Sequence, residues 1–129
     1  MLRELSATLS SSLRPFDTVA RWGGEEFGII LSPETTRDEA REICERLRAR
    51  VQNLAIVVPS LDGRQNTARV TLSMGGAMFP QDVSVPAEAA RGLDAAGRDK
   101  LAHELWTRAN LHLRLAKESG KNQVRMAGV

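Results

Sequence analysis

The feature that most constrains this chain is a pair of adjacent glycines, Gly23 and Gly24, set between two short apolar runs. The first run ends at Trp22 and the second begins at Phe27. Two glycines can both adopt a positive φ without steric penalty, as a type I′ hairpin turn requires. The sequence therefore predicts an antiparallel β-hairpin over residues 18–31 with both glycines at its tip.

Two adjacent carboxylates, Glu25 and Glu26, follow the glycines. Because successive strand residues point to opposite faces, the two side chains are expected on opposite faces of the hairpin. A turn at the glycines places Arg21 opposite Glu26, which gives Glu26 a cross-strand ion partner. Glu25 then shares a face with Phe27 and Ile29 and is the better candidate for binding a cation. The alternative is a solvated hairpin end with two surface carboxylates.

Helical and extended patterns alternate along the rest of the chain. Apolar periodicity predicts helices over 2–13, 35–51 and 101–119, with one helical turn at 87–90 inside a loop over 80–97. Extended runs predict strands over 55–58, 69–79 and 122–126. These patterns predict one α+β domain over residues 1–129, with helices packed on a mostly antiparallel sheet.

Composition excludes several classes of protein. The chain has 129 residues, 42% of them hydrophobic and 26% charged, which suits one globular domain. A net charge of +2 and 4% aromatic residues without tyrosine argue against DNA or RNA as a partner. The single cysteine, Cys44, is expected to be a buried apolar residue. No apolar run approaches the ~18 residues of a membrane span, so a cytoplasmic location is expected by default.

The string RWGGEEF at residues 21–27 resembles the signature of the GGDEF family, the diguanylate cyclases. Three further motifs follow the order of the family. RPFD at 14–17 resembles the RxxD inhibitory motif, VTLSMGG at 70–76 is similar to a later strand, and residues 109–122 resemble the final helix and its exit. On these four matches the chain is identified as a member of the family.

The resemblance implies a nucleotide-cyclase sandwich, palm-like or ferredoxin-like, and an enzyme that condenses two GTP into cyclic di-GMP and two pyrophosphates. Two domains face each other in a homodimer, and Mg2+ is the cofactor. Glu25 would be the metal-ligating carboxylate and Glu26 a second acidic residue needed for catalysis. Gly23 and Gly24 would make room for the nucleotide.

The resemblance also assigns four charged residues. Lys117 and Lys121 match positions that contact the GTP phosphates. Without the resemblance, the preferred interpretation of both lysines is a basic helix C-terminus stabilised by the helix dipole. Arg14 and Asp17 match the pair that binds product cyclic di-GMP and restrains the enzyme. An arginine fork suits guanine O6 and N7, and a carboxylate can accept from guanine N1–H and N2–H2. The alternative for this pair is a local ion pair after a helix.

The chain departs from the family before Leu2, where no D-x-D-x-F-K strand or N-D-x-x-G-H segment is found, and in the last helix at Asn110 and Arg114. The expectation is an N-terminally truncated, partial GGDEF domain that is inactive as this chain alone. An upstream sensor or regulatory domain is expected, in a parent protein that can be membrane-tethered. The alternative function is a non-catalytic cyclic di-GMP receptor that uses Arg14 and Asp17. A third possible function is that of a protein–protein adaptor domain that uses the exposed edge of the sheet.

Overall fold

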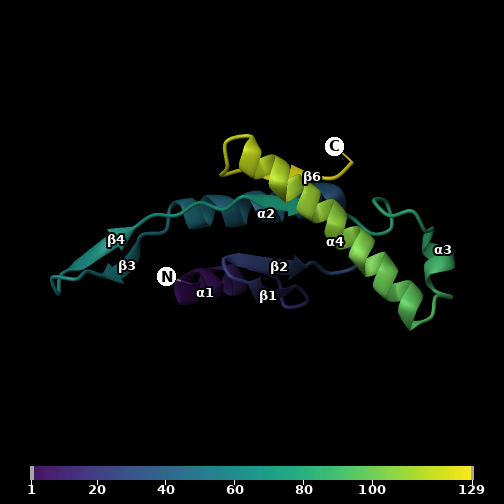
Figure 1. The fold of residues 1–129 in the computed structure, drawn as a ribbon, viewed down its shortest axis with the longest axis horizontal. Helices are drawn as coiled ribbons and strands as arrows, with labels where there is room; N and C mark the ends of the chain where they lie inside the picture. The colour runs from purple at the N-terminus through teal and green to yellow at the C-terminus, as the bar shows by residue number, and fades with distance from the viewer. Residues whose placement is uncertain (1, 129) are drawn as a thin grey trace. The chain divides into compact units, whose positions relative to one another are not determined.

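The computed structural model describes residues 2–128, which form an α+β arrangement of four helices and six short strands (Figure 1). The helices are α1 (Leu2–Ser12), α2 (Arg37–Gln52), α3 (Ala87–Ala90) and α4 (Ala95–Glu118). The strands are β1 (Thr18–Gly23), β2 (Glu26–Ile30), β3 (Ile56–Pro59), β4 (Gln65–Ala68), β5 (Met74–Gly76) and β6 (Val124–Met126). The chain divides into two compact units, a first unit up to Leu72 and a second unit from Ser73.

The helices of the first unit follow their predicted apolar stripes. Helix α1 buries Leu5 and Leu9 and ends before Pro15, since a residue that precedes proline is disfavoured in helical geometry. Helix α2 begins after Thr36, whose Oγ1 accepts a hydrogen bond from the Glu39 amide at 3.2 Å. The residues that α2 buries are Ala40, Ile43, Leu47 and Val51. None of the helices within residues 2–128 is long and apolar enough to cross a bilayer.

Strands β1 and β2 form the predicted hairpin, but the predicted register is wrong. Arg21 pairs with Phe27 and Gly23 pairs with Glu26, with an irregularity between Arg21 and Gly23. The two turn residues are therefore Gly24 and Glu25, and of the two glycines at the tip only Gly24 has a positive φ, +53°. One positive φ at the first central position is the pattern of a type II′ turn, whereas the predicted type I′ turn needs two. The bulge adds one residue to β1 and moves the turn along the chain.

A second antiparallel hairpin follows α2. The turn around Gly63, with φ +79°, joins the predicted strand β3 to β4, which the sequence patterns did not indicate. Strand β4 reads Gln-Asn-Thr-Ala and is mostly exposed, so it lacks the apolar alternation by which strands are recognised. Ile56 of β3 is buried, whereas Val57 and Leu61 are exposed.

The second unit is built around α4 (Figure 1). Strand β5 pairs in parallel with β6 and lies against α4, but only residues 74–76 of the predicted strand over 69–79 are extended in a ladder. Helix α4 begins at Ala95, six residues before the predicted start at 101, because Asp94 caps it by accepting from the Gly97 amide at 2.8 Å. Within residues 2–128, pairing is shared among three two-stranded sheets, two antiparallel and one parallel, rather than one mostly antiparallel sheet.

Candidate functional site

The tip of the β1–β2 hairpin presents the GGEEF residues at the surface. Gly23, Gly24, Glu25 and Glu26 are all exposed. A Cβ atom added at either glycine would meet no atom of residues 2–128 within 4 Å, so these residues leave the space over both glycines open. Arg21 does not pair with Glu26 as predicted, because its Nε donates to the Gly24 carbonyl at 3.0 Å. Glu25 therefore sits in the turn itself rather than on a strand face.

The carboxylates at this tip do not make a complete magnesium site. Mg2+ needs several oxygen ligands in near-octahedral geometry. No group of three His, Cys, Asp or Glu side chains that could hold a metal ion is found within residues 2–128. Glu25 offers one carboxylate in an open turn, and the set of donors around it does not fit Mg2+ by itself.

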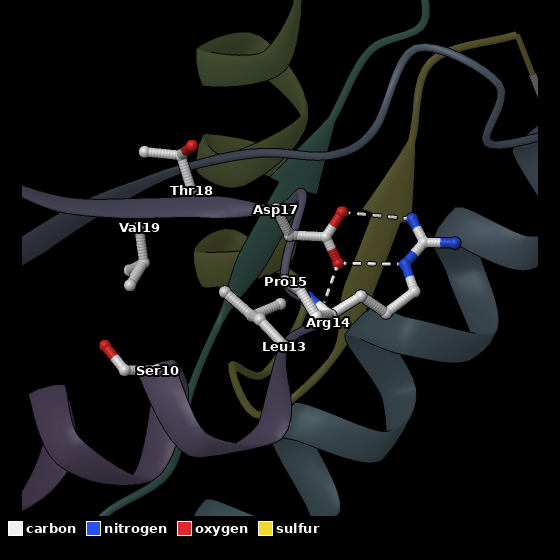
Figure 2. Close-up of a pocket in the computed structure, with 7 residues that line it drawn as sticks. All are labelled: Ser10, Leu13, Arg14, Pro15, Asp17, Thr18 and Val19. Carbon is white, nitrogen blue, oxygen red and sulfur yellow. Dashed lines mark hydrogen bonds and ion pairs between the residues drawn. The ribbon is translucent and has the colours of Figure 1, made fainter.

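Arg14 and Asp17 are brought together in the loop between α1 and β1 (Figure 2). Asp17 Oδ2 accepts from Arg14 Nε at 2.9 Å and from the Arg14 amide at 3.0 Å. Asp17 Oδ1 accepts from Arg14 Nη2 at 3.1 Å and from the Ser32 amide at 2.8 Å. Arg14 Nη2 also donates to the Thr35 hydroxyl at 2.6 Å. The pair thus ties the end of α1 to the start of β1 and to the segment between β2 and α2.

Four hydrogen bonds keep the Asp17 carboxylate charged. The Arg14 guanidinium is the main reason that the pKa of Asp17 is lowered to about 2, and the amides of Ser32 and Arg14 act in the same direction. Desolvation opposes them, since the Asp17 side chain is 0% exposed. The same ion pair raises the pKa of Arg14. Asp17 is therefore a buried anion whose charge is matched by one cation and two backbone donors.

This geometry changes what each member of the pair can offer to a ligand. Asp17 has two engaged oxygens and no exposed side-chain surface, so in this conformation it cannot accept from a guanine edge. Arg14 is 38% exposed, and its Nε and Nη2 are engaged by Asp17 and Thr35. The nitrogen that remains is Nη1, which lies 3.9 Å from Glu39 Oε2. A guanine could meet Nη1, whereas a fork of two nitrogens would require Thr35 or Asp17 to release Nη2.

A shallow depression adjoins the pair on the α1 side. It has a volume of about 440 Å³ and is lined by Ser10, Leu13, Arg14, Pro15, Asp17, Thr18 and Val19. Figure 2 shows the Ser10, Thr18 and Val19 side chains on the opposite side of Asp17 from the Arg14 guanidinium. Apolar and hydroxyl groups thus lie beside the charged pair, a mixture that suits a polar organic ligand.

Lys117 and Lys121 belong to the second unit, at the end of α4 and in the turn that follows it. Both are exposed. The turn contains three consecutive residues with positive φ: +111° at Gly120, +60° at Lys121 and +46° at Asn122. Two of the three are not glycine and adopt the left-handed conformation. The Lys121 amide donates to the Ala116 carbonyl at 3.0 Å, and the Asn122 amide donates to Ser73 Oγ at 3.2 Å. Strained backbone conformations of this kind are concentrated at functional sites.

Sequence reasoning missed three residues that complete these sites. Thr35 and Glu39 contact Arg14 from the N-terminal side of α2, and Ser73 holds the turn that carries Lys121. The spacing Thr36-x-x-Glu39 matches a capping box and draws attention to Glu39. Ser73 stands inside the VTLSMGG string, but a hydrogen bond between residues 49 positions apart has no local signal.

The fold and these motifs define a nucleotide-cyclase class of domain, and comparison with known proteins gives the family. The family model described as "Diguanylate cyclase, GGDEF domain" matches residues 1–123. The chain therefore belongs to the GGDEF family.

Curated relatives agree with this assignment. Over 124 residues, or 96% of this chain, it is 33% identical to YhcK of Bacillus subtilis and to the response regulator PleD of Caulobacter vibrioides. It is also 28% identical to diguanylate cyclase A of Treponema denticola over 127 residues, 98% of the chain. The chain spans only 29%, 23% and 28% of the lengths of these three proteins.

Solved structures share the fold. The GGDEF domain of DgcB from Caulobacter crescentus, in complex with c-di-GMP, is similar with a TM-score of 0.71 at 22% identity, covering 98% of this chain and 63% of that one. Diguanylate cyclase SiaD from Pseudomonas aeruginosa, in complex with its activator SiaC, is similar with a TM-score of 0.68 at 29% identity, covering 98% of this chain and 40% of that one. The α+β architecture predicted from the sequence is confirmed.

Proposed function

We propose that this chain is the catalytic domain of a diguanylate cyclase, which condenses two GTP into cyclic di-GMP and two pyrophosphates. The observation that carries the proposal is the GGEEF turn, in which an exposed Glu25 follows a positive-φ glycine with open space above it. Gly23 and Gly24 admit the nucleotide to this turn. Because the product has two-fold symmetry, a homodimer is the natural catalyst.

Charge neutralisation is the main requirement of phosphoryl transfer, since positioning and electrostatics dominate that chemistry. Lys117 and Lys121 are proposed to offset the charge of the GTP phosphates. Glu25 is the proposed Mg2+ ligand, and Glu26 is the second acidic residue. One carboxylate holds Mg2+ weakly, so residues 1–129 alone are proposed to form no product. An upstream sensor or regulatory domain would control the working enzyme.

The test measures cyclic di-GMP formed from GTP and Mg2+ by the chain and by a chimera. In the chimera, the opening strand and the following segment of the PleD GGDEF domain precede Leu2. We expect no product from the chain and steady turnover by the chimera, because the added strand supplies further carboxylates. Glu25→Ala in the chimera should abolish turnover, and Glu34→Gln, a change at an exposed glutamate before α2, should leave it intact. A folded chimera that forms no product would refute the proposal.

A second candidate function is a regulatory module that binds cyclic di-GMP at Arg14. It is favoured by the way Asp17 and Thr35 hold the guanidinium by hydrogen bonds from Nε and Nη2, while Nη1 lies 3.9 Å from Glu39 Oε2, beyond hydrogen-bond distance. In this proposal Arg14 touches the ligand, and Asp17 contributes by holding Arg14 in place.

Calorimetry with cyclic di-GMP tests this second function. Arg14→Ala should weaken binding at least tenfold, because a hydrogen bond to a charged donor is lost. Arg98→Ala removes an exposed arginine from the first turns of α4 and serves as the matched control. Equal heats for the wild type and Arg14→Ala would rule out binding at this arginine.

A further inference from the structure

The turn between α4 and β6 holds both of the peptide groups that flank Lys121 (Figure 1). On the N-terminal side, the Lys121 amide donates to the Ala116 carbonyl at 3.0 Å. On the C-terminal side, the Lys121 carbonyl accepts from Gln123 Nε2 at 3.1 Å. The Asn122 amide of that same peptide group donates to Ser73 Oγ at 3.2 Å. Since φ and ψ are the rotations of these two peptide groups about the Cα atom, the contacts fix the backbone of Lys121.

The Gln123 carboxamide is itself oriented by its contacts. Its Nε2 also donates to the Ser119 carbonyl at 2.9 Å, and its Oε1 accepts from Arg125 Nε at 2.8 Å. An amide NH2 group has two hydrogens, one for each of the two carbonyls. A carboxamide rotated by half a turn would place its oxygen against both carbonyl oxygens and its NH2 against the Arg125 guanidinium. Gln123 therefore joins the carbonyls on either side of Gly120 in one defined orientation.

Lys121 needs this support more than its neighbours do. Its φ of +60° lies in the left-handed region, which is unfavourable for a residue with a Cβ atom. Gly120 adopts its positive φ without that penalty, and asparagine tolerates the region better than lysine. Because Lys121 is exposed, packing of its side chain contributes little to holding it. The hydrogen bonds of the turn therefore keep Lys121 in this conformation.

We propose that Gln123 is a positioning residue for Lys121, which it holds in one backbone conformation so that the ε-ammonium is presented to the phosphates of GTP. The inference rests on the contact between Lys121 and the GTP phosphates proposed above. Gln123 does not touch the nucleotide in this proposal. It acts because a lysine that is ordered on folding does not have to be ordered again on binding, which raises the affinity. Ser73 assists from the other end of the same peptide group.

A double-mutant cycle at Gln123 and Lys121 tests the inference through GTP binding by the full chain. The dissociation constant in Mg2+ is measured from the amide chemical shifts of the 15N-labelled chain. We expect Lys121→Ala to weaken binding about tenfold, because a charged contact to phosphate is lost. Gln123→Ala should weaken it about fivefold in the wild-type background, because Lys121 must then be ordered on binding. In the Lys121→Ala background, Gln123→Ala should change binding by less than about 1.5-fold.

Gln81→Ala is the matched control, since it truncates an exposed glutamine of the same unit. It should leave GTP binding unchanged. Urea midpoints of all the variants verify that the fold is retained.

The outcomes separate this inference from the contact on which it rests. If Lys121→Ala weakens GTP binding and Gln123→Ala does not, the inference is overturned while the role of Lys121 stands. An equal loss from Gln123→Ala with and without Lys121 also overturns it, because Gln123 would then act on the fold or on the ligand and not through Lys121. If Lys121→Ala binds GTP like the wild type, or if the wild-type chain binds none, the phosphate contact fails and the inference fails with it.

Discussion

Replacing Gly75 with alanine is expected to destabilise the second unit by about 3 kcal/mol or more. A Cβ atom at Gly75 would lie 2.7 Å from Leu113 Cα and closer still to the Leu113 amide nitrogen and the Ala109 carbonyl oxygen. All three are backbone atoms of α4, which cannot rotate out of the way as a side chain can. Either β5 leaves its ladder with β6 or the helix moves, and both disturb the packing of the unit.

Gly76→Ala is the matched control for this prediction. The added Cβ would meet Met126 Sδ at 2.5 Å and Met126 Cε at 2.9 Å, both at the end of a flexible side chain. Its cost should be about 1 kcal/mol. Urea denaturation in a Trp22→Phe background follows the second unit alone, because Trp106 in α4 is then the remaining tryptophan. Equal midpoints for the two alanine variants would contradict the packing argument.

Replacing Asp17 with asparagine is expected to destabilise the first unit by about 2 kcal/mol at neutral pH. The substitution removes the charge that matches Arg14 and converts one acceptor oxygen into a donor that faces the Arg14 or Ser32 N–H groups. Trp22 fluorescence in a Trp106→Phe background reports the first unit. Asp99→Asn, at an exposed position of α4, controls for the loss of a carboxylate.

The destabilisation by Asp17→Asn should also depend on pH. The folded-state pKa of Asp17 is about 2, below the ordinary value near 3.8, because the Arg14 guanidinium donates to the carboxylate. A lowered pKa stabilises the folded state above pH ~4, and this stabilisation is lost as the pH falls from about 4 to about 2. Since Arg14 is 38% exposed, the effect is expected to be about 1 to 2 kcal/mol. A difference between wild type and Asp17→Asn that stays constant from pH 6 to pH 2 would show that the charge does not matter.

The helices of the first unit could be predicted because their signals are local. For α1 the local signal is an apolar stripe that ends before Pro15. For α2 it is the N-cap residue Thr36 followed by four apolar residues at helical spacing, all of them buried. The hairpin could be predicted from Gly23 and Gly24, but its register could not. The bulge between Arg21 and Gly23 depends on pairing across the strands, which glycine content alone does not specify.

The candidate sites could be predicted as motifs but not as geometry. The string RPFD identifies Arg14 and Asp17, yet only the folded chain shows that Asp17 is buried and that Thr35 holds the same guanidinium. The Arg14–Thr35 contact joins residues 21 positions apart and the Asp17–Ser32 contact joins residues 15 positions apart, separations over which spacing carries no information. Strand β4 was missed for a different reason, because its polar residues pair with β3 without burying an apolar face.

The left-handed turn after α4 has a consequence for mutational tolerance. At Lys121 and Asn122, β-branched side chains clash with their own backbone, whereas glycine, asparagine and aspartate fit. A saturation library sorted for folding alone would therefore enrich those three residues at codon 121, and lysine would persist there only under selection for its charge. The residues enriched at codon 121 thus show whether selection acted on the backbone conformation or on the charge of the side chain.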